Sequence, residues 1–392
     1  MKKICLIIPN VFPVPAVKGG ACEQLVTDFI NENEKYKKLD ITVISPFDEE
    51  AEQRSKIYNY TKFKYIQVNE EENKVRDLFY SEQDKDFIFY KNEIKKSVDL
   101  QEFDYIIIEG GNAEGYRDLL QDCDKEKCIL HIHGNLEGNK DIEEIYGYFI
   151  TVSNFVAEEL AQNGIISRDR IYTIYNGINI EKFEKKISKQ EKEELREKYN
   201  IKNDDIVILF CGRTVKTKGV KELLLAVEQM KNLDKSKLLI VGNSNFAKEV
   251  KTEYDQELFD ISKKIPNKVQ FTGFINNDIL YKIHNISDIA VVPTIGEEAF
   301  GLVVVEAMSS GLPLITTISG GIPEIVGTDD NGILLKKDED FVSNLSKALD
   351  YLIDNKEVRE KLSIEEKKRA KEFDLDHYYN RFIEFFTKLD RL

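Results

Sequence analysis

The chain carries the stretch TIGEEAFGLVVVEAMSSG at residues 294–311. Two carboxylates in it, Glu298 and Glu306, flank Gly301 with seven residues between them. A helix that begins near Gly301 presents unpaired backbone N–H groups and the positive end of its dipole to an anion. The pattern therefore predicts a junction of loop and helix that offers an anion site between two carboxylates.

The places of the two carboxylates at this junction suit a nucleotide sugar. Glu306 lies about one turn inside the expected helix, on the side of Leu302, while Glu298 stays on the approaching loop. One carboxylate can hold ribose hydroxyls and the other the sugar ring, with the diphosphate between them. The alternative is an acidic loop before a buried helix or strand, because residues 303–305 are a β-branched run with weak helix preference.

A second charged motif lies upstream, in the run CGRTVKTKG at residues 211–219. A buried strand is expected to end at its glycine, and Arg213 and Lys218 follow before a new helix. Ligands of open α/β sheets bind outside the carboxyl ends of the strands, so two cations there are well placed for phosphates. A charged surface loop is the alternative. The P-loop, dinucleotide and zinc-hydrolase interpretations lack their motifs in this chain.

Two glycines and one histidine are the candidate site residues of the first half. Gly19 and Gly20 follow a proline-rich turn and precede an expected helix at 21–31, where glycine lets the backbone approach a ligand. His133 follows an apolar run in HIHGN, and strand alternation sends His131 to the same face. A flexible turn and a structural histidine are the respective alternatives.

Short apolar runs alternate with amphipathic stretches, which is the pattern of parallel sheets covered by helices on both faces. The expected strands cover 4–8, 41–44, 105–108, 128–132, 148–152, 206–211, 238–241, 269–272, 289–292, 314–316 and 333–335. The expected helices cover 21–31, 154–163, 220–231, 277–283 and 341–354. A charged run at 184–199 separates the two series, and aromatic residues at helical spacing in 376–392 predict a last helix that packs on a large surface. The fold class is therefore α/β with two domains.

Composition excludes several classes of protein. A length of 392 residues with 42% hydrophobic content is enough for two globular domains. A net charge of -15 argues against nucleic acid as a partner, because phosphate backbones require a basic surface. Five cysteines without metal-ligand spacing fit free thiols in a reducing cytoplasm. The first apolar run stops at Pro9, below the length of a signal peptide or membrane span, so any membrane contact is expected to be peripheral.

The region 68–98 is highly charged and contains an aromatic cluster of Phe79, Tyr80, Phe87, Phe89 and Tyr90. One interpretation is a solvated helical pair whose aromatic side chains reach the core. The other is an element that contacts the acceptor or a membrane surface, because aromatic and basic side chains suit sugar rings and lipid headgroups.

Together these segments resemble the retaining glycosyltransferases of GT-B fold, a large family with an E-x7-E motif. The family includes sucrose synthases, bacterial mannosyl- and N-acetylglucosaminyltransferases, and many capsule and cell-wall enzymes. Arg213 and Lys218 look like its diphosphate-binding pair, and the stretch from Glu298 to Glu306 matches the E-x7-E motif. The first half is similar through Gly19, Gly20, Glu23, His133, Ser153 and the linker YNGIN, in which Asn179 replaces the commoner aspartate.

The resemblance implies two Rossmann-like domains that face each other across a cleft. Residues 1–180 would form the acceptor-side domain, completed by a C-terminal helix at 375–392 that crosses back to it. Residues 181–374 would bind the nucleotide sugar. By resemblance, Glu306 holds the ribose hydroxyls, Glu298 the donor sugar, and Arg213 and Lys218 the diphosphate. His133 reaches the donor sugar from the first domain, and the phosphate cradle is completed by Phe300, Gly301, Leu302 and Val303.

The implied reaction is hexosyl transfer with retention and without a metal or other cofactor. The donor is a nucleotide diphosphate sugar, with uridine favoured over guanosine or adenosine. The acceptor is a glycan, glycolipid or glycoprotein of bacterial surface glycan or glycoconjugate synthesis, and the expected location is the cytoplasm or the inner face of the membrane. Two alternatives stay open: a GT-B phosphorylase or epimerase, and a non-catalytic nucleotide-sugar-binding subunit that supports a partner enzyme.

Overall fold

The computed structural model describes residues 1–68, 85–134, 136, 140–243 and 252–391. It divides the chain into an N-terminal domain, Met1–Gly177 with Leu375–Leu392, and a C-terminal domain, Ile178–Asp374. The sequence had placed the first boundary at 180/181 and the return at 375. The charged run expected to separate the domains is not itself the boundary, because it contains helix α7 (Lys189–Lys198), which follows α6 (Ile180–Glu184) inside the C-terminal domain.

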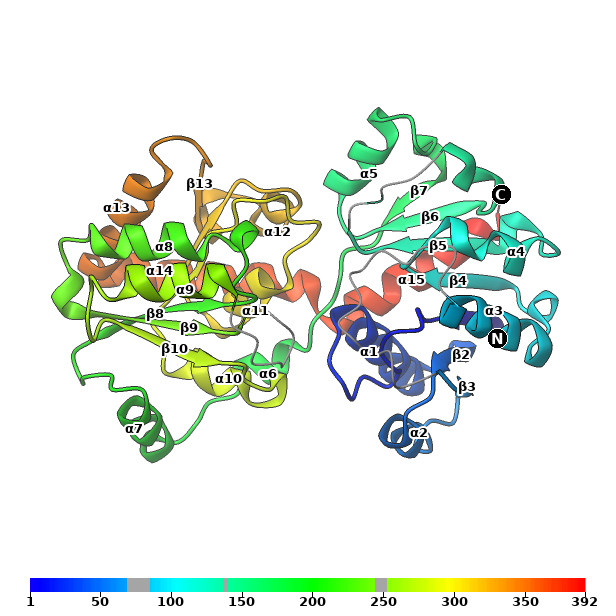
Figure 1. The fold of residues 1–392 in the computed structure, drawn as a ribbon, viewed down its shortest axis with the longest axis horizontal. Coiled ribbons are helices and arrows are strands. Elements are labelled where there is room, and N and C mark those ends of the chain that lie inside the picture. Colours follow the sequence, from blue (N-terminus) through cyan, green and yellow to red (C-terminus); the bar gives the residue numbers. More distant parts are fainter. Residues whose placement is uncertain (69–84, 135, 137–139, 244–251, 392) are drawn as a thin grey trace. The chain divides into compact units, whose positions relative to one another are not determined.

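The described part of the N-terminal domain contains a parallel sheet of seven strands in the order β3-β2-β1-β4-β5-β6-β7 (Figure 1). The strand order reverses between β1 and β4, and ligands of such sheets bind outside the carboxyl ends at this switch point. The strands are β1 (Lys2–Ile7), β2 (Leu39–Pro46), β3 (Thr61–Ile66), β4 (Tyr105–Glu109), β5 (Cys128–Ile132), β6 (Tyr148–Thr151) and β7 (Ile171–Thr173).

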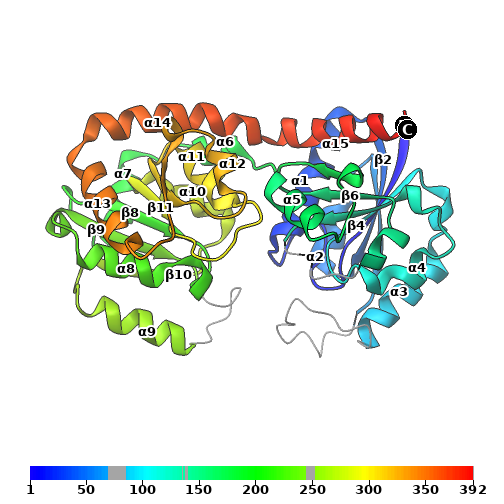
Figure 2. The same ribbon diagram turned by 90° about the horizontal axis from the view of Figure 1, so that it is seen from above.

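Helices cover both faces of this sheet (Figure 2). On one face, α1 (Ala21–Tyr36) packs against α15 (Leu375–Leu389), with the rings of Phe29 and Phe382 4.7 Å apart. On the other face lie α3 (Lys85–Ser97) and α4 (Arg117–Leu120), while α2 (Glu49–Ser55) and α5 (Asn154–Gln162) complete the domain. The expectation that the C-terminal helix packs on a large surface is confirmed: its buried residues are Tyr378, Tyr379, Phe382, Phe385, Phe386 and Leu389.

The aromatic cluster expected in region 68–98 is described only in part. Phe79 and Tyr80 lie outside the described residues. In α3, Phe87 and Tyr90 are buried, and the Tyr90 hydroxyl donates to the carbonyl of Ile8 at 2.9 Å. Phe87 and Tyr90 therefore reach the core, as one of the two interpretations predicted, whereas Phe89 is 47% exposed and does not.

The C-terminal domain contains, among its described residues, a parallel sheet of six strands in the order β10-β9-β8-β11-β12-β13. Its switch point lies between β8 and β11. The strands are β8 (Ile206–Cys211), β9 (Ser236–Val241), β10 (Val269–Gly273), β11 (Ile289–Val292), β12 (Leu314–Thr317) and β13 (Ile333–Leu335). The helices are α8 (Val220–Glu228), α9 (Glu253–Ser262), α10 (Asn277–Asn285), α11 (Leu302–Ser310), α12 (Ile322–Val326), α13 (Phe341–Asp354) and α14 (Lys356–Ala370).

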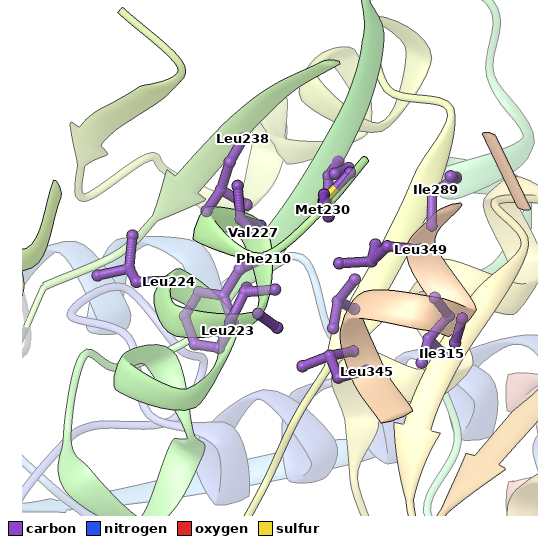
Figure 3. Packing of buried hydrophobic residues seen from close by; sticks show 14 of the residues in the cluster. Phe210, Leu223, Leu224, Val227, Met230, Leu238, Ile289, Ile315, Leu345 and Leu349 are labelled. Atoms are coloured by element: carbon purple, nitrogen blue, oxygen red, sulfur yellow. The ribbon is translucent and has the colours of Figure 1, made fainter. Parts of the chain in front are cut away.

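A buried apolar cluster fixes one face of this second sheet (Figure 3). Residues of β8, β9, β11 and β12 pack in it against α8 and α13, and the labelled members are Phe210, Leu223, Leu224, Val227, Met230, Leu238, Ile289, Ile315, Leu345 and Leu349. Full burial of each such side chain contributes about 1.5–3 kcal/mol. The cluster therefore anchors the strands whose carboxyl ends carry the charged motifs.

Each expected strand is present within a residue or two of its expected limits. The sequence missed two strands, β3 and β7, and several helices, namely α2, α4, α6, α7, α9, α12 and α14. Strand β3 lies at the sheet edge and carries Lys62 and Lys64, so it lacks the continuous apolar run of a central strand. Within the described chain, every helix falls short of the length and apolarity that a bilayer crossing requires.

Candidate functional site

Two loops meet at the switch point of the C-terminal domain. The loop after β8 ends at Gly219, which has φ of 72°, and a Cβ there would lie 1.8 Å from the carbonyl oxygen of Pro293. The carbonyl of Thr217 accepts the backbone N–H groups of Ile295 and Gly296 at 2.9 and 3.0 Å. The loop that follows β11 is therefore held by backbone contacts against the loop that follows β8.

This contact joins the basic and the acidic motif. Lys218 Nζ donates to Glu298 Oε2, and the two side chains are 23% and 19% exposed. The lysine follows β8 and the glutamate follows β11, so they belong to the two strands on either side of the switch point. Arg213 lies at the start of the same basic loop and is exposed. The sequence predicted both motifs, and the structure brings Lys218 and Glu298 into contact.

A third loop, after β12, holds the acidic loop in place. Gly321 N–H donates to the carbonyl of Glu298 at 2.8 Å, and a Cβ on Gly320 would lie 2.0 Å from that same oxygen. The neighbouring Glu297 accepts from Gly320 N–H at 2.7 Å and from Lys337 Nζ at 2.7 Å. Glu298 thus sits on a backbone fixed from the opposite side, with its carboxylate directed to Lys218.

The predicted junction of loop and helix is present. Helix α11 begins at Leu302, and Gly301 occupies the N-cap position with φ of 111°. None of the described side chains caps this end, so backbone N–H groups of the first turn remain available to an anion. Phe300 is buried edge-on against Phe373, with ring centroids 5.8 Å apart. The alternative of a strand at 303–305 is wrong, because Val303 lies in the first turn of α11.

Glu306 lies further along α11, close to the end of β8. It is half-buried, and burial raises the pKa of its carboxyl to about 7, although the charge of Lys182 opposes the rise. The same proximity shows at Cys211, whose thiol has a pKa raised by burial and by Glu306. Ser310 Oγ donates to the carbonyl of Glu306 at 2.9 Å and lies 2.7 Å from His284 Nδ1. The carboxyl group is therefore held in a poorly solvated place, where burial outweighs the charge of Lys182.

In the N-terminal domain, a buried carboxylate joins the two candidate histidines. Glu109 ends β4, and its Oε2 accepts from His131 Nδ1 at 2.9 Å and from His133 Nε2 at 3.0 Å. Burial opposes charge on this carboxyl, but the two histidines lower its pKa to about 2. Burial also opposes charge on His133, but the Cys22 sulfur and Glu109 raise its pKa to about 10. His133 is therefore a charged ring paired with Glu109.

Sequence reasoning did not find Glu109. The signal was available, because Glu109 directly follows the expected strand 105–108 as His133 follows the expected strand 128–132. Parallel strands end at the same edge of a sheet, and Glu109 pairs in register with His131. The predicted common face of His131 and His133 is confirmed, with ring centroids 4.0 Å apart.

The first turn of α1 and the glycines before it lie close to Glu109 and His133. Gly19 and Gly20 have φ of 89° and 94°, and a Cβ on Gly20 would lie 2.0 Å from Glu23 Oε2. Burial raises the pKa of Glu23 to about 7, the charge of His133 lowers it, and Glu109 raises it further. Glycine at position 20 is thus favoured by its positive φ, and its missing side chain leaves room for the Glu23 carboxyl group.

The group of Glu109, His131 and His133 has the spacing of a metal site. One ligand atom from each lies within 4.8 Å of the others, which a divalent ion would accept. Glu109 Oε2 is, however, already at hydrogen-bond distance from both rings. His133 forms a charged pair with Glu109, and His131 donates a second hydrogen bond to the same oxygen. The geometry therefore permits an ion without requiring one.

Several buried polar atoms near these strand ends have no hydrogen-bond partner among the described residues. They belong to Asn10 after β1, Thr294 after β11 and His131 (Nε2). Buried polar atoms are normally paired, and each exception calls for an explanation. A polar ligand that reaches the carboxyl edge of each sheet would give these atoms hydrogen-bond partners.

Comparison with known proteins agrees with this architecture. Residues 191–369 match the family described as "Glycosyl transferases group 1". The chain is 32% identical over 224 residues to the "Uncharacterized glycosyltransferase MJ1607" of Methanocaldococcus jannaschii, with 55% of this chain and 56% of that protein covered. It is 26% identical over 261 residues to the "Lipopolysaccharide 1,2-N-acetylglucosaminetransferase" of Salmonella typhimurium, with 65% and 66% covered. The chain thus spans less than two thirds of the length of either relative.

A solved structure shares the fold over the whole chain. Anabaena Alr3699/HepE, solved in complex with UDP, aligns with a TM-score of 0.74 at 18% sequence identity, with 99% of this chain and 100% of that chain covered. At this identity the likeness concerns the fold. Residues 191–369 therefore match the group 1 glycosyl transferases, in a chain whose two Rossmann-like domains have the GT-B fold.

Proposed function

We propose that this protein is a retaining glycosyltransferase that moves a sugar from a nucleotide diphosphate sugar, with a UDP-sugar favoured, to an acceptor hydroxyl. The observation that carries the proposal is the meeting of Lys218 and Glu298 at the switch point of the C-terminal domain. The family of residues 191–369 supports glycosyl transfer. The UDP bound to HepE supports the base, and the lipopolysaccharide relative supports a surface glycan or glycoconjugate as acceptor.

The diphosphate is the first part of the donor that the site would bind. In the structure Lys218 is neutralised by Glu298, in a pair that is largely withdrawn from solvent. A diphosphate would take over the lysine as its counter-ion, with Arg213 as a second cation and the start of α11 as a source of N–H donors. Glu298 would then be released to accept hydroxyl groups of the sugar. This single exchange of partners thus gives Lys218 a role in binding the diphosphate and Glu298 a role in binding the sugar.

The nucleoside is the second part. Glu306 offers an acceptor in a poorly solvated position beside the end of β8. A ribose with two neighbouring hydroxyls would give this carboxylate two donors, which favours its charged form. Burial alone disfavours that form, so a bound ribose relieves a cost that the free protein carries. This is the pattern expected where a buried polar group is kept for binding.

The chemical step would then rest on the departing diphosphate. The bond between the anomeric carbon and the diphosphate oxygen breaks, and the acceptor oxygen forms its bond from the same face, which preserves the configuration. The proton of the acceptor hydroxyl passes to the departing diphosphate oxygen. Lys218, Arg213 and the α11 N-terminus stabilise the charge that develops there. The proposal needs no metal or organic cofactor, since these groups are directed at the same charge.

The test is a panel of UDP-, GDP- and ADP-sugars, each incubated with the protein without acceptor, with slow release of nucleoside diphosphate as the readout. The matched pair of variants is Lys218→Ala and Lys221→Ala. Lys221 lies three residues further on, but it pairs with Glu257 at 2.6 Å and is 41% exposed. Hydrolysis should fall with the first variant and persist with the second. If no nucleotide sugar is hydrolysed but one still binds, the non-catalytic subunit replaces this proposal.

A further inference from the structure

The loop from α4 to β5 begins and ends near a cysteine. Cys123 follows α4 and is half-buried, and Cys128 is the buried first residue of β5. Both are free thiols in the structure. The N–H of Cys123 donates to the carbonyl of Leu120 at 2.9 Å, so the turn after α4 fixes its backbone. Neither cysteine belongs to the proposed donor site.

Sheet register fixes the face of the sheet on which Cys128 lies. Cys128 pairs with Ile106 of β4, and Ile106 pairs with Cys5 of β1, so all three side chains point to the same side. Tyr105, the neighbour of Ile106, stacks instead on Phe386 of α15. Cys128 therefore faces away from α15, toward the side where α4 and its following loop lie.

On that side the two thiols come together. Cys128 Sγ lies 3.5 Å from the carbonyl oxygen of Asp124, the residue after Cys123. Each thiol is the leading influence on the pKa of the other, because Cys128 lowers the pKa of Cys123 and Cys123 raises the pKa of Cys128. The thiolate is the reactive form of cysteine, so Cys123 is the better nucleophile of the two.

A cavity of about 210 Å³ gives access to one member of the pair. It is lined by Cys123, together with Ile106, Asp122 and Lys127 among others, while Cys128 does not line it. A small reagent would reach the nucleophilic thiol first, with the second thiol behind it. That is the order of a reactive and a resolving cysteine.

We propose that Cys123 and Cys128 are a redox modification site, a dithiol that a hydroperoxide converts into an intramolecular disulfide. The Cys123 sulfur attacks the terminal oxygen of the hydroperoxide, the O–O bond breaks, and the alcohol leaves with a proton. The Cys128 sulfur then attacks the resulting sulfenic acid, the S–S bond forms, the S–O bond breaks, and water leaves. The two thiols are oxidised by two electrons and the hydroperoxide is reduced.

Trypsin provides a direct test on the full chain, because it cleaves after Lys125 and Lys127, between the two cysteines. The fragments 118–125 and 128–140 each hold one cysteine and separate unless a disulfide joins them. After treatment with hydrogen peroxide and alkylation of the remaining thiols, the two fragments should appear as one linked peptide. The intact protein should lose two of its five alkylatable thiols and the mass of two hydrogen atoms.

Variants and a reductant complete the test. Dithiothreitol should separate the linked fragments and restore alkylation of both thiols. Cys123→Ser should abolish the linked peptide, and Cys211→Ser, a half-buried cysteine of the other domain, should leave it unchanged. Two results on the wild-type chain would overturn the proposal. One is full alkylation of Cys123 and Cys128 after peroxide, and the other is a disulfide that joins Cys123 to Cys5. Neither measurement depends on glycosyl transfer.

Discussion

Replacing Glu306 by glutamine is expected to weaken nucleotide binding and at the same time to stabilise the free protein. The two effects share one cause. The carboxyl group is half-buried, and burial raises its pKa from 4.5 to about 7, against the opposing charge of Lys182. The free protein therefore holds a carboxylate in a place that disfavours its charge. Glutamine keeps the shape and removes that charge.

The magnitude follows from the two pKa values. The unfolded chain releases the proton near pH 4.5, and the folded protein keeps it until about pH 7. Between these values the folded protein binds more protons, so its stability falls as the pH rises, and the loss is complete above about pH 7. At roughly 1.4 kcal/mol for each pH unit the loss is about 3 kcal/mol. The partial exposure of Glu306 reduces this to about 2 kcal/mol.

Urea unfolding of wild type and Glu306→Gln measures the stability effect, followed by circular dichroism because the chain contains no tryptophan. The variant should match wild type at pH 4 and exceed it by about 2 kcal/mol at pH 8. Calorimetric titration with UDP at pH 8 measures the binding effect. Loss of hydrogen bonds to a charged group costs about 1.5–3 kcal/mol, so the affinity should fall by roughly 10- to 150-fold.

Glu298→Gln is the matched control, because this second carboxylate of the motif is paired with Lys218. Its removal leaves a cation without its partner, so no stabilisation is expected at pH 8. Turnover should fall, while the affinity for free UDP should be kept or increased. The reasoning is refuted if Glu306→Gln is no more stable than wild type at pH 8. Equal losses of UDP affinity in the two variants would show that the division of roles is wrong.

The remaining predictions concern the diphosphate, the histidine pair and the metal. Lys218→Ala and Arg213→Ala should each lower kcat/KM by an amount that corresponds to about 2–4 kcal/mol. Arg213→Lys should not fully restore the activity, because a lysine cannot make the forked contact of an arginine. Near-normal rates in both alanine variants would contradict the phosphate assignment. Glu109→Gln should destabilise the protein at pH 6 by about 3 kcal/mol, measured by urea unfolding. The pKa of Glu109 is lowered to about 2, so this difference is present above pH 4.5 and should shrink as the pH falls toward 2; a constant difference would show that the carboxylate charge is not its source. Turnover should survive EDTA, and loss of activity with rescue by a divalent ion would count against a metal-free site.

The fold was predictable because its central strands are continuous apolar runs. Strands buried on both faces need little information beyond hydrophobicity, so β1, β4, β5, β8 and β11 stand out in the sequence. The missed elements are those whose burial depends on their neighbours. Helix α14 is mostly charged along its length, and β7 has only three residues at a sheet edge. Their stability comes from tertiary packing that the local pattern does not contain.

The sequence predicted the motifs of the candidate site but not the contacts between their residues. The sequence places Lys218 and Glu298 at the ends of two strands eighty residues apart. Their pairing depends on the approach of Gly219 to Pro293, which is a property of the folded backbone. Glu109 was missed for a related reason. Its role as a partner of His131 follows from the register of β4 with β5. The register between two strands cannot be inferred from the sequence of either strand alone.

The pair of Lys218 and Glu298 also bears on donor preference. A nucleoside diphosphate without a sugar would take the lysine and leave Glu298 without a partner, in a position where it is only 19% exposed. That uncompensated carboxylate would reduce the net gain from the phosphate contact. A nucleotide sugar offers the carboxylate hydroxyl donors, so both charges are satisfied in the donor complex. The protein as a whole carries a net charge of -15, which opposes the approach of any anion. Selection for the intact donor over its product would therefore come from Glu298 accepting the sugar, because the phosphate contact alone is offset by the pair it breaks.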